Sequence, residues 1–140
     1  MALENPAGAT GPLRAEPPDA NEFDGLRQRA RMRLRDAANA SLALESRFDL
    51  AYGAAHSMSL AALRHAGYRP RNQRYIVFQV LPHTLGLAPE VWRLLSKCHD
   101  VRNLAEYEGD LNINERLVVD LLAACDAVSE ALDRLPPLPR

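Results

Sequence analysis

The chain has 140 residues, of which 47% are hydrophobic and only 6% aromatic, and its formal net charge is −1. This length and hydrophobic content fit one domain with one core, and the abundance of Ala, Leu and Arg favours packed helices over sheet. No apolar run is long enough to span a bilayer, and the first residues lack the basic-then-apolar pattern of a secretion signal. We therefore expect a cytoplasmic protein that does not enter a membrane.

The small net charge conceals a strong segregation of charge along the sequence. Residues 1–24 and 90–140 each sum to −4, whereas residues 25–49 sum to +3 and residues 50–89 to +4. A basic middle section predicts a face for an anionic partner such as RNA. The same pattern is also expected if the two halves simply attract each other within the fold.

The N-terminal residues 1–21 are expected to form a disordered tail, because they are rich in Pro and Gly and offer little to bury.

A first helix is predicted from Asn21 or Asp24 to about Ala38. Arginines alternate with apolar residues over 26–35, which is the period of a strand, but the apolar residues are Leu, Ala and Met, which favour helix. The arginines then lie on the outer face of this helix, either as a solvated surface or as a ridge facing phosphates. The expected inner face is Phe23, Leu26, Ala30, Leu34 and Ala37.

A second helix is predicted from Ser41, as its N-cap, to Ala66, where Gly67 ends it. His56 and His65 lie on this helix without partners at metal-ligand spacing. We expect both to be ordinary surface or interface residues.

The next segment, residues 68–88, is ambiguous in its secondary structure. The stretch 75–81 has strand-like propensity, but a single strand in a helical chain has nothing to pair with. A short buried helix from about Asn72 to Leu81, ended or kinked by Pro82, fits better.

Two further helices complete the predicted fold. The first begins at Pro89 and ends near Glu108, with Gly109 as its C-terminal cap. The second follows a capping box of Asn112 and Glu115 and ends before residues 136–137. We therefore predict an all-α, antiparallel up-and-down bundle of four to five helices over residues 22–135, followed by a short tail, 136–140. Its apolar positions include Cys98 and Cys125, which we expect to be buried free thiols.

Polar side chains gather at the end of the helix over 89–108. His99, Arg102, Asn103 and Glu106 fall at i, i+3, i+4 and i+7, so they share one helix face, and Tyr107 extends it. This polar seam is predicted to be a part of the bundle whose polar groups are all hydrogen-bonded, a symmetric interface, or a functional site.

The seam resembles the motif of the HEPN superfamily (higher eukaryotes and prokaryotes nucleotide-binding). The Ala-rich stretch 47–69 is similar to the long first hairpin helix of that family, so the resemblance covers about residues 24–135. It implies a homodimer with facing motif helices and, as in many members, a metal-independent ribonuclease of toxin–antitoxin or defence systems. Other members are paired with a small nucleotidyltransferase.

The HEPN motif is an Arg, a small polar residue and a His four to six positions after the Arg. Arg102 and Asn103 match it, but position 107 is Tyr and no His follows. Metal-free RNA cleavage needs a base for the ribose hydroxyl and a cation for the phosphate. The resemblance therefore implies Arg102 as the cation and His99 as a substitute base, with no cofactor or metal. Asn103, Glu106 and Tyr107 are the expected binding residues.

Two other functions are compatible with the same residues. The protein could be a non-catalytic partner or substrate of a nucleotidyltransferase, with the hydroxyl of Tyr107 as the modified group. Alternatively, the bundle is purely structural, the seam is only a dimer contact, and Arg102 forms an i,i+4 ion pair with Glu106.

Overall fold

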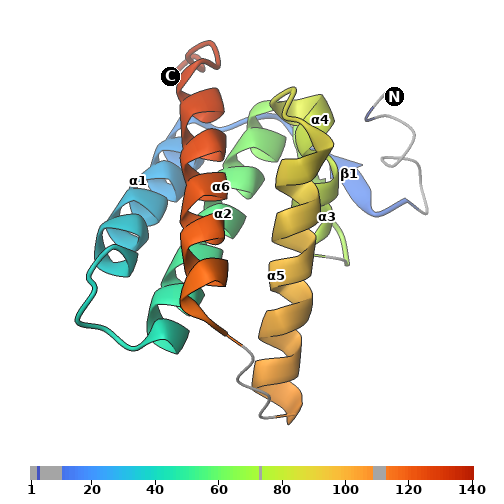
Figure 1. Ribbon diagram of the computed structural model, residues 1–140. Helices are drawn as coiled ribbons and strands as arrows, with labels where there is room; N and C mark the ends of the chain where they lie inside the picture. The colour runs from blue at the N-terminus through green and yellow to red at the C-terminus, as the bar shows by residue number, and fades with distance from the viewer. Residues whose placement is uncertain (1–2, 4–10, 73, 109–112) are drawn as a thin grey trace.

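The computed structural model describes residue 3 and residues 11–72, 74–108 and 113–140, with the backbone alone for 106–108. Within these ranges it contains four long helices and two of four residues each. These are α1 (Ala20–Ala37), α2 (Leu44–His65), α3 (Ile76–Gln79), α4 (Leu81–Thr84), α5 (Pro89–Glu108) and α6 (Glu115–Asp133). Consecutive long helices run in opposite directions (Figure 1), which confirms the predicted all-α antiparallel bundle.

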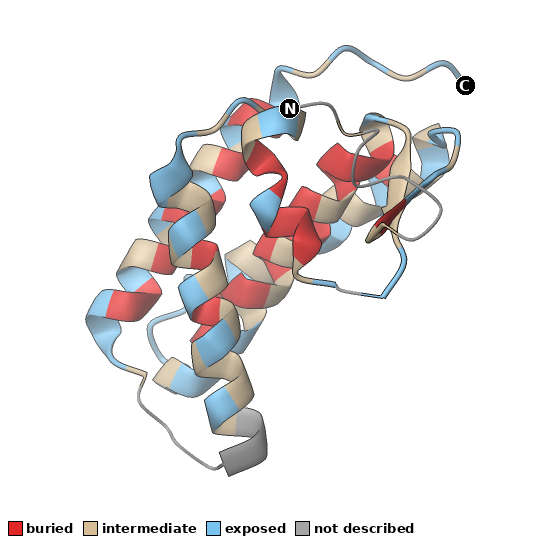
Figure 2. Cartoon of the chain, turned by 90° about the vertical axis from the view of Figure 1, so that its right-hand side faces the viewer, coloured by how far each residue is buried: buried red, intermediate tan, exposed pale blue. Residues whose placement is uncertain are grey.

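The core is built around α2, which packs against α1, α5, α6 and the short α3. Much of the buried face of α2 is alanine, so the neighbouring helices approach closely, and Phe48 fills the space at its N-terminal end. Buried positions alternate with exposed ones along each long helix (Figure 2), as amphipathic helices in a bundle require. None of the described helices is long and apolar enough to cross a membrane.

The N-terminal segment differs from the predicted tail. Residues Leu13–Ala15 form β1, which pairs in antiparallel register with β2 (Tyr68–Pro70), and the Leu13 side chain is fully buried. The expectation of disorder up to residue 21 is therefore wrong for the described part, 11–21. Strands of three residues are too short to leave a periodicity in the sequence, so the pairing was not predicted.

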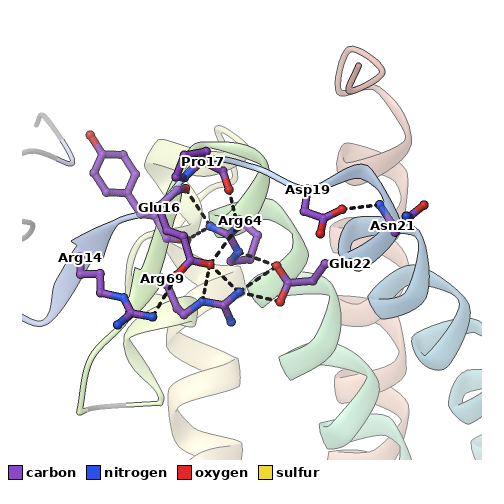
Figure 3. A network of polar contacts seen from close by, with 9 residues as sticks. Arg14, Glu16, Pro17, Asp19, Asn21, Glu22, Arg64 and Arg69 are labelled. Atoms are coloured by element: carbon purple, nitrogen blue, oxygen red, sulfur yellow. Dashed lines mark hydrogen bonds and ion pairs between the residues drawn. The ribbon is translucent and has the colours of Figure 1, made fainter. Parts of the chain in front are cut away.

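A network of charged groups holds this segment against the C-terminal end of α2 (Figure 3). Arg64 is only 1% exposed, and its Nε donates to a carboxylate oxygen of Glu22 at 2.7 Å. Its remaining nitrogens donate to the backbone oxygens of Glu16 at 3.0 Å and Pro17 at 2.7 Å. Arg69 pairs with both Glu16 and Glu22. The buried guanidinium is thus satisfied by residues from α1 and the strand segment.

Helix α2 begins later than predicted. Its N-cap is Ala43, which makes no side-chain capping bond, and the backbone N–H and hydroxyl of Ser41 bond instead to the side-chain oxygen of Asn39. Ser41 therefore belongs to a local turn and not to the helix terminus. Gly67 has φ of +92°, a left-handed conformation that ends the helix as predicted.

The segment after β2 is helical, as predicted, but it is divided in two. Helix α3 covers only Ile76–Gln79, and Pro82 lies in the first turn of α4 instead of ending a longer helix. A proline is tolerated at that position because its missing N–H has no intrahelical partner to lose. The buried side chains of α3 face the bundle interior, as predicted.

The last two helices follow the prediction closely. Helix α5 has the predicted bounds, while Gly109 and Asn112 lie outside the described residues. The predicted capping box of Asn112 and Glu115 is wrong, because the N-cap of α6 is Asn114, whose side chain accepts from the N–H of Leu117 at 2.9 Å. Cys98 and Cys125 are buried free thiols, and burial raises the pKa of each to about 12.

Candidate functional site: a cationic pocket

A pocket of about 510 Å³ opens between α1, α2, α5 and the segment that precedes α3. Among the described residues, its wall carries four arginines and two histidines against a single acid, Asp49. The lining is Leu26, Arg29, Arg33, Asp49, Tyr52, Gly53, His56, Ser57, Leu60, Arg74, His99 and Arg102. The pocket therefore has a strongly positive wall.

Only part of the polar seam of α5 lines this pocket. His99 and Arg102 line it, and Asn103 lies behind His99, to which it is hydrogen-bonded. The side chains of Glu106 and Tyr107 lie outside the described residues, so their expected roles in binding stay predictions.

His99 is held through both of its ring nitrogens. Its Nδ1 lies 2.9 Å from the hydroxyl of Tyr52 on α2, and its Nε2 lies 3.2 Å from the amide nitrogen of Asn103, one turn further along α5. The amide nitrogen is a donor, so Nε2 accepts and the N–H of a neutral imidazole is on Nδ1, directed at the Tyr52 oxygen. His99 is thereby fixed in one orientation at the junction of α2 and α5.

Arg102 lies over the aromatic ring of Tyr52, with its guanidinium carbon 5.2 Å from the ring centroid. This cation–π contact places the charge at the pocket wall. Burial raises the pKa of Tyr52, an effect that Arg102 and Arg74 oppose through their charges. Tyr52 therefore remains a neutral hydroxyl near pH 7.

His56 was expected to be an ordinary surface or interface residue, but it lines the pocket one helical turn after Tyr52. Its Nε2 is buried without a hydrogen-bond partner among the described residues, and its ring packs edge-on against Phe78. Burial, aided by the charges of Arg74 and Arg102, lowers the pKa of His56 to about 4, while a hydrogen bond to the backbone of Arg74 opposes the shift. His56 is therefore neutral at pH 7.

Gly53 creates the space in which Arg33 lies across α2. A Cβ atom at position 53 would meet the Cδ of Arg33 at 3.4 Å, so a larger side chain would compete with it for the pocket. The Nε of Arg33 is buried and has no hydrogen-bond partner among the described residues. A buried donor without a partner costs free energy, so this Nε is a feature that a structural role alone does not explain.

The basic section of the sequence indicated an anion-binding face but did not locate it. The basic section over residues 25–89 supplies Arg29, Arg33 and Arg74, and the seam supplies Arg102. Asp49, Tyr52, Gly53 and His56 fall at i, i+3, i+4 and i+7 along α2, which is the spacing of residues that share one helix face.

The arrangement suits an anionic ligand more than a metal ion. Among the residues that the structure describes, no three His, Cys, Asp or Glu side chains lie together in a way that could hold a metal. The guanidinium groups are instead hydrogen-bond donors suited to phosphate or carboxylate oxygens.

Comparison with known proteins adds no relative: no family model matches the chain, and no curated protein or solved structure shows significant similarity to it.

Proposed function

We propose that the cationic pocket binds the phosphate backbone of RNA, and that the protein is a HEPN-like component of a toxin–antitoxin or defence system. On this proposal it cleaves RNA without a metal ion. The observation that carries the proposal is that four arginines from three parts of the fold line one pocket together with His99.

The electrostatics of the pocket favour an anion. Among the described residues that line the pocket, four arginines, Arg29, Arg33, Arg74 and Arg102, outnumber one acid, Asp49. Gathering like charges around one cavity costs free energy, and an anion in the cavity offsets that cost. RNA supplies one negative charge per phosphate together with oxygen acceptors for guanidinium donors.

The proposed chemistry assigns a role to each group of the α5 seam. Arg102 would stabilise the charge that develops on the phosphate, and Asn103 would keep His99 in its orientation. His99 would position Tyr52 in the wall of the pocket that faces the RNA, and no His stands at position 107, where the motif has one.

The proposal includes a homodimer. Leu104, next to Asn103 on α5, is 41% exposed, and we place it in the proposed contact with the second copy. Replacing Leu104 with Glu would place a charge in such a contact and shift the protein to monomer in analytical ultracentrifugation. Unchanged sedimentation of this variant would remove Leu104 from the proposed interface.

The test of RNA binding uses two arginine variants with the same change in charge. Arg102→Ala removes a pocket arginine, and Arg35→Ala removes an exposed arginine of α1 that does not line the pocket. We expect Arg102→Ala to weaken binding of a short single-stranded RNA about tenfold or more, and Arg35→Ala to weaken it less than about threefold. The slope of log affinity against log salt should fall by about 0.7 for Arg102→Ala, as for the loss of one phosphate contact.

Cleavage is tested with the same proteins in EDTA. The wild-type chain should cut single-stranded RNA, Arg35→Ala should retain this activity, and Arg102→Ala should lose most of it. Equal effects of the two variants on binding, or intact RNA after incubation with the wild-type chain, would contradict the proposal.

A further inference from the structure

Building on the proposed RNA cleavage, we propose that His56, and not His99, receives the proton of the ribose 2′-hydroxyl. His56 lies on α2, outside the α5 seam that resembles a known motif. The inference rests on which imidazole of the pocket has a ring nitrogen without a hydrogen-bond partner among the described residues.

His99 has no nitrogen left for this role. Its Nδ1 is 2.9 Å from the Tyr52 hydroxyl, and its Nε2 is 3.2 Å from the Asn103 amide nitrogen. To accept a proton from RNA, His99 would first have to give up the hydrogen bond at Nε2. In this geometry His99 positions Tyr52 and the wall of the pocket.

His56 has the opposite arrangement. Its Nε2 is buried and without a hydrogen-bond partner among the described residues, although the side chain lines the same pocket as Arg102. Its ring is fixed against Phe78, with ring centroids 5.9 Å apart and planes at 90°. An unpaired nitrogen on the wall of a pocket is a costly feature unless a ligand completes it.

Burial, aided by nearby positive charges, keeps the ring of His56 neutral at pH 7. The charged and titratable groups that line the same pocket are Arg29 and Arg33 from α1, Asp49 from α2, Arg74 from the segment before α3, and His99 and Arg102 from α5. Burial and the positive charges of Arg74 and Arg102 bring the pKa of His56 to about 4, so Nε2 holds a lone pair at pH 7. A bound phosphodiester offsets the positive charges and raises the pKa of His56, which strengthens it as a base when the substrate is present.

The proposed step balances as follows. Nε2 of His56 takes the proton of the 2′-hydroxyl, and the 2′-oxygen attacks the adjacent phosphorus. The bond between phosphorus and the 5′-oxygen of the next nucleotide breaks, and that oxygen takes a proton from water. The products are a 2′,3′-cyclic phosphate and a free 5′-hydroxyl, and the imidazolium of His56 returns its proton to solvent.

The test compares His56→Gln with His99→Gln, because glutamine keeps polar hydrogen bonding but does not act as a base near neutral pH. Binding and cleavage of one short single-stranded RNA are measured in EDTA for both variants and the wild type. We expect His56→Gln to lower the cleavage rate about 100-fold or more while binding changes less than about threefold. His99→Gln should retain more activity than His56→Gln.

A second measurement does not depend on the variants folding. The His56 ring is titrated by NMR in the wild-type chain, alone and with a 2′-O-methyl RNA that cannot be cleaved. The His56 resonance is assigned by through-bond NMR experiments on the wild-type chain, and we expect the pKa of His56 to rise on binding.

The outcomes separate the two proposals. If the wild type cleaves RNA but His56→Gln cleaves it as fast, or the pKa of His56 does not rise with bound RNA, the role of His56 is overturned while the proposed function stands. If the wild type binds and cleaves no RNA, the proposed function fails, and the role of His56 fails with it.

Discussion

Nε of Arg64 donates a 2.7 Å hydrogen bond to the carboxylate of Glu22, and this contact joins the last turn of α2 to the first turn of α1. The Arg64 side chain is 2% exposed, whereas that of Glu22 is 29% exposed. The pair therefore combines a buried charge, which needs partners, with a carboxylate that still reaches water. It fixes one end of the helix pair whose other turns form the pocket wall.

Arg64→Ala should be strongly destabilising. It leaves the Glu22 carboxylate without one of its cationic partners and the backbone oxygens of Glu16 and Pro17 without a donor. We expect the free energy of unfolding to fall by about 3–5 kcal/mol, measured by urea denaturation. The control is Arg116→Ala, whose side chain is 83% exposed in an i,i+4 pair with Asp120, and which should cost less than about 0.5 kcal/mol. Similar losses for both variants would show that the Arg64 network contributes little.

The stability of the protein should fall as the pH is lowered from about 6.5 toward 4, in part because of His56. Its pKa is about 4 in the folded chain and about 6.5 when exposed, so between these values the unfolded chain binds more protons. This single group contributes a slope of up to about 1.4 kcal/mol per pH unit within that window. Urea denaturation from pH 7 to pH 5 should show a shallower slope for His56→Gln than for the wild type. Parallel slopes would mean that His56 has an ordinary pKa in the folded chain.

Tyr52→Phe should separate the hydroxyl of Tyr52 from its ring. The variant keeps the ring beneath Arg102 but removes the hydrogen bond to Nδ1 of His99. We expect a loss of about 1 kcal/mol in the free energy of unfolding. The matched control is Tyr75→Phe, which retains a ring contact with His99 at a centroid distance of 5.2 Å. It should change stability by less than about 0.5 kcal/mol, and a larger loss than for Tyr52→Phe would contradict the assignment.

Substitutions at Gly53 should distinguish helix stability from space in the pocket. A Cβ at this position meets Arg33 at an ordinary contact distance, so Gly53→Ala should stabilise the protein by about 0.5–1 kcal/mol through helix propensity alone. Gly53→Leu should instead displace Arg33 and weaken RNA binding without removing any charge.

The control for this substitution is Gly25→Leu. Gly25 lies on α1, and a Cβ there meets nothing within 4 Å. RNA binding by Gly25→Leu should equal that of the wild type. If Gly53→Leu also binds RNA normally, the space beside Arg33 is not part of the binding site.

The bundle could be predicted because each long helix has a clear amphipathic pattern. Helix α5 has the predicted bounds, and α1 is helical despite its alternating arginines, since Leu, Ala and Met favour helix wherever packing allows it. The first residue of α2 was harder to predict, because Ser41, in the turn between Ala37 and Leu44, is as suitable for a turn as for an N-cap.

The pocket could be predicted only in part. Periodicity shows which residues share a helix face, but it does not show which faces meet across the bundle. Arg29 and Arg33 were expected on a solvated surface or a phosphate-facing ridge, and they line the same pocket as His56 only because α1 packs along α2. The burial of His56 depends in turn on Phe78, from a segment whose helix was predicted with the wrong bounds.

The lining of the pocket extends along the chain from Leu26 to Arg102, so its parts come together only when the bundle is folded. Any molecule that occupies it must therefore stabilise the native state, by an amount that grows with the logarithm of its concentration. A panel of nucleotides, oligonucleotides and simple anions could accordingly be ranked by the rise in melting temperature that each produces. The natural ligand could be sought in this way before any reaction has been detected.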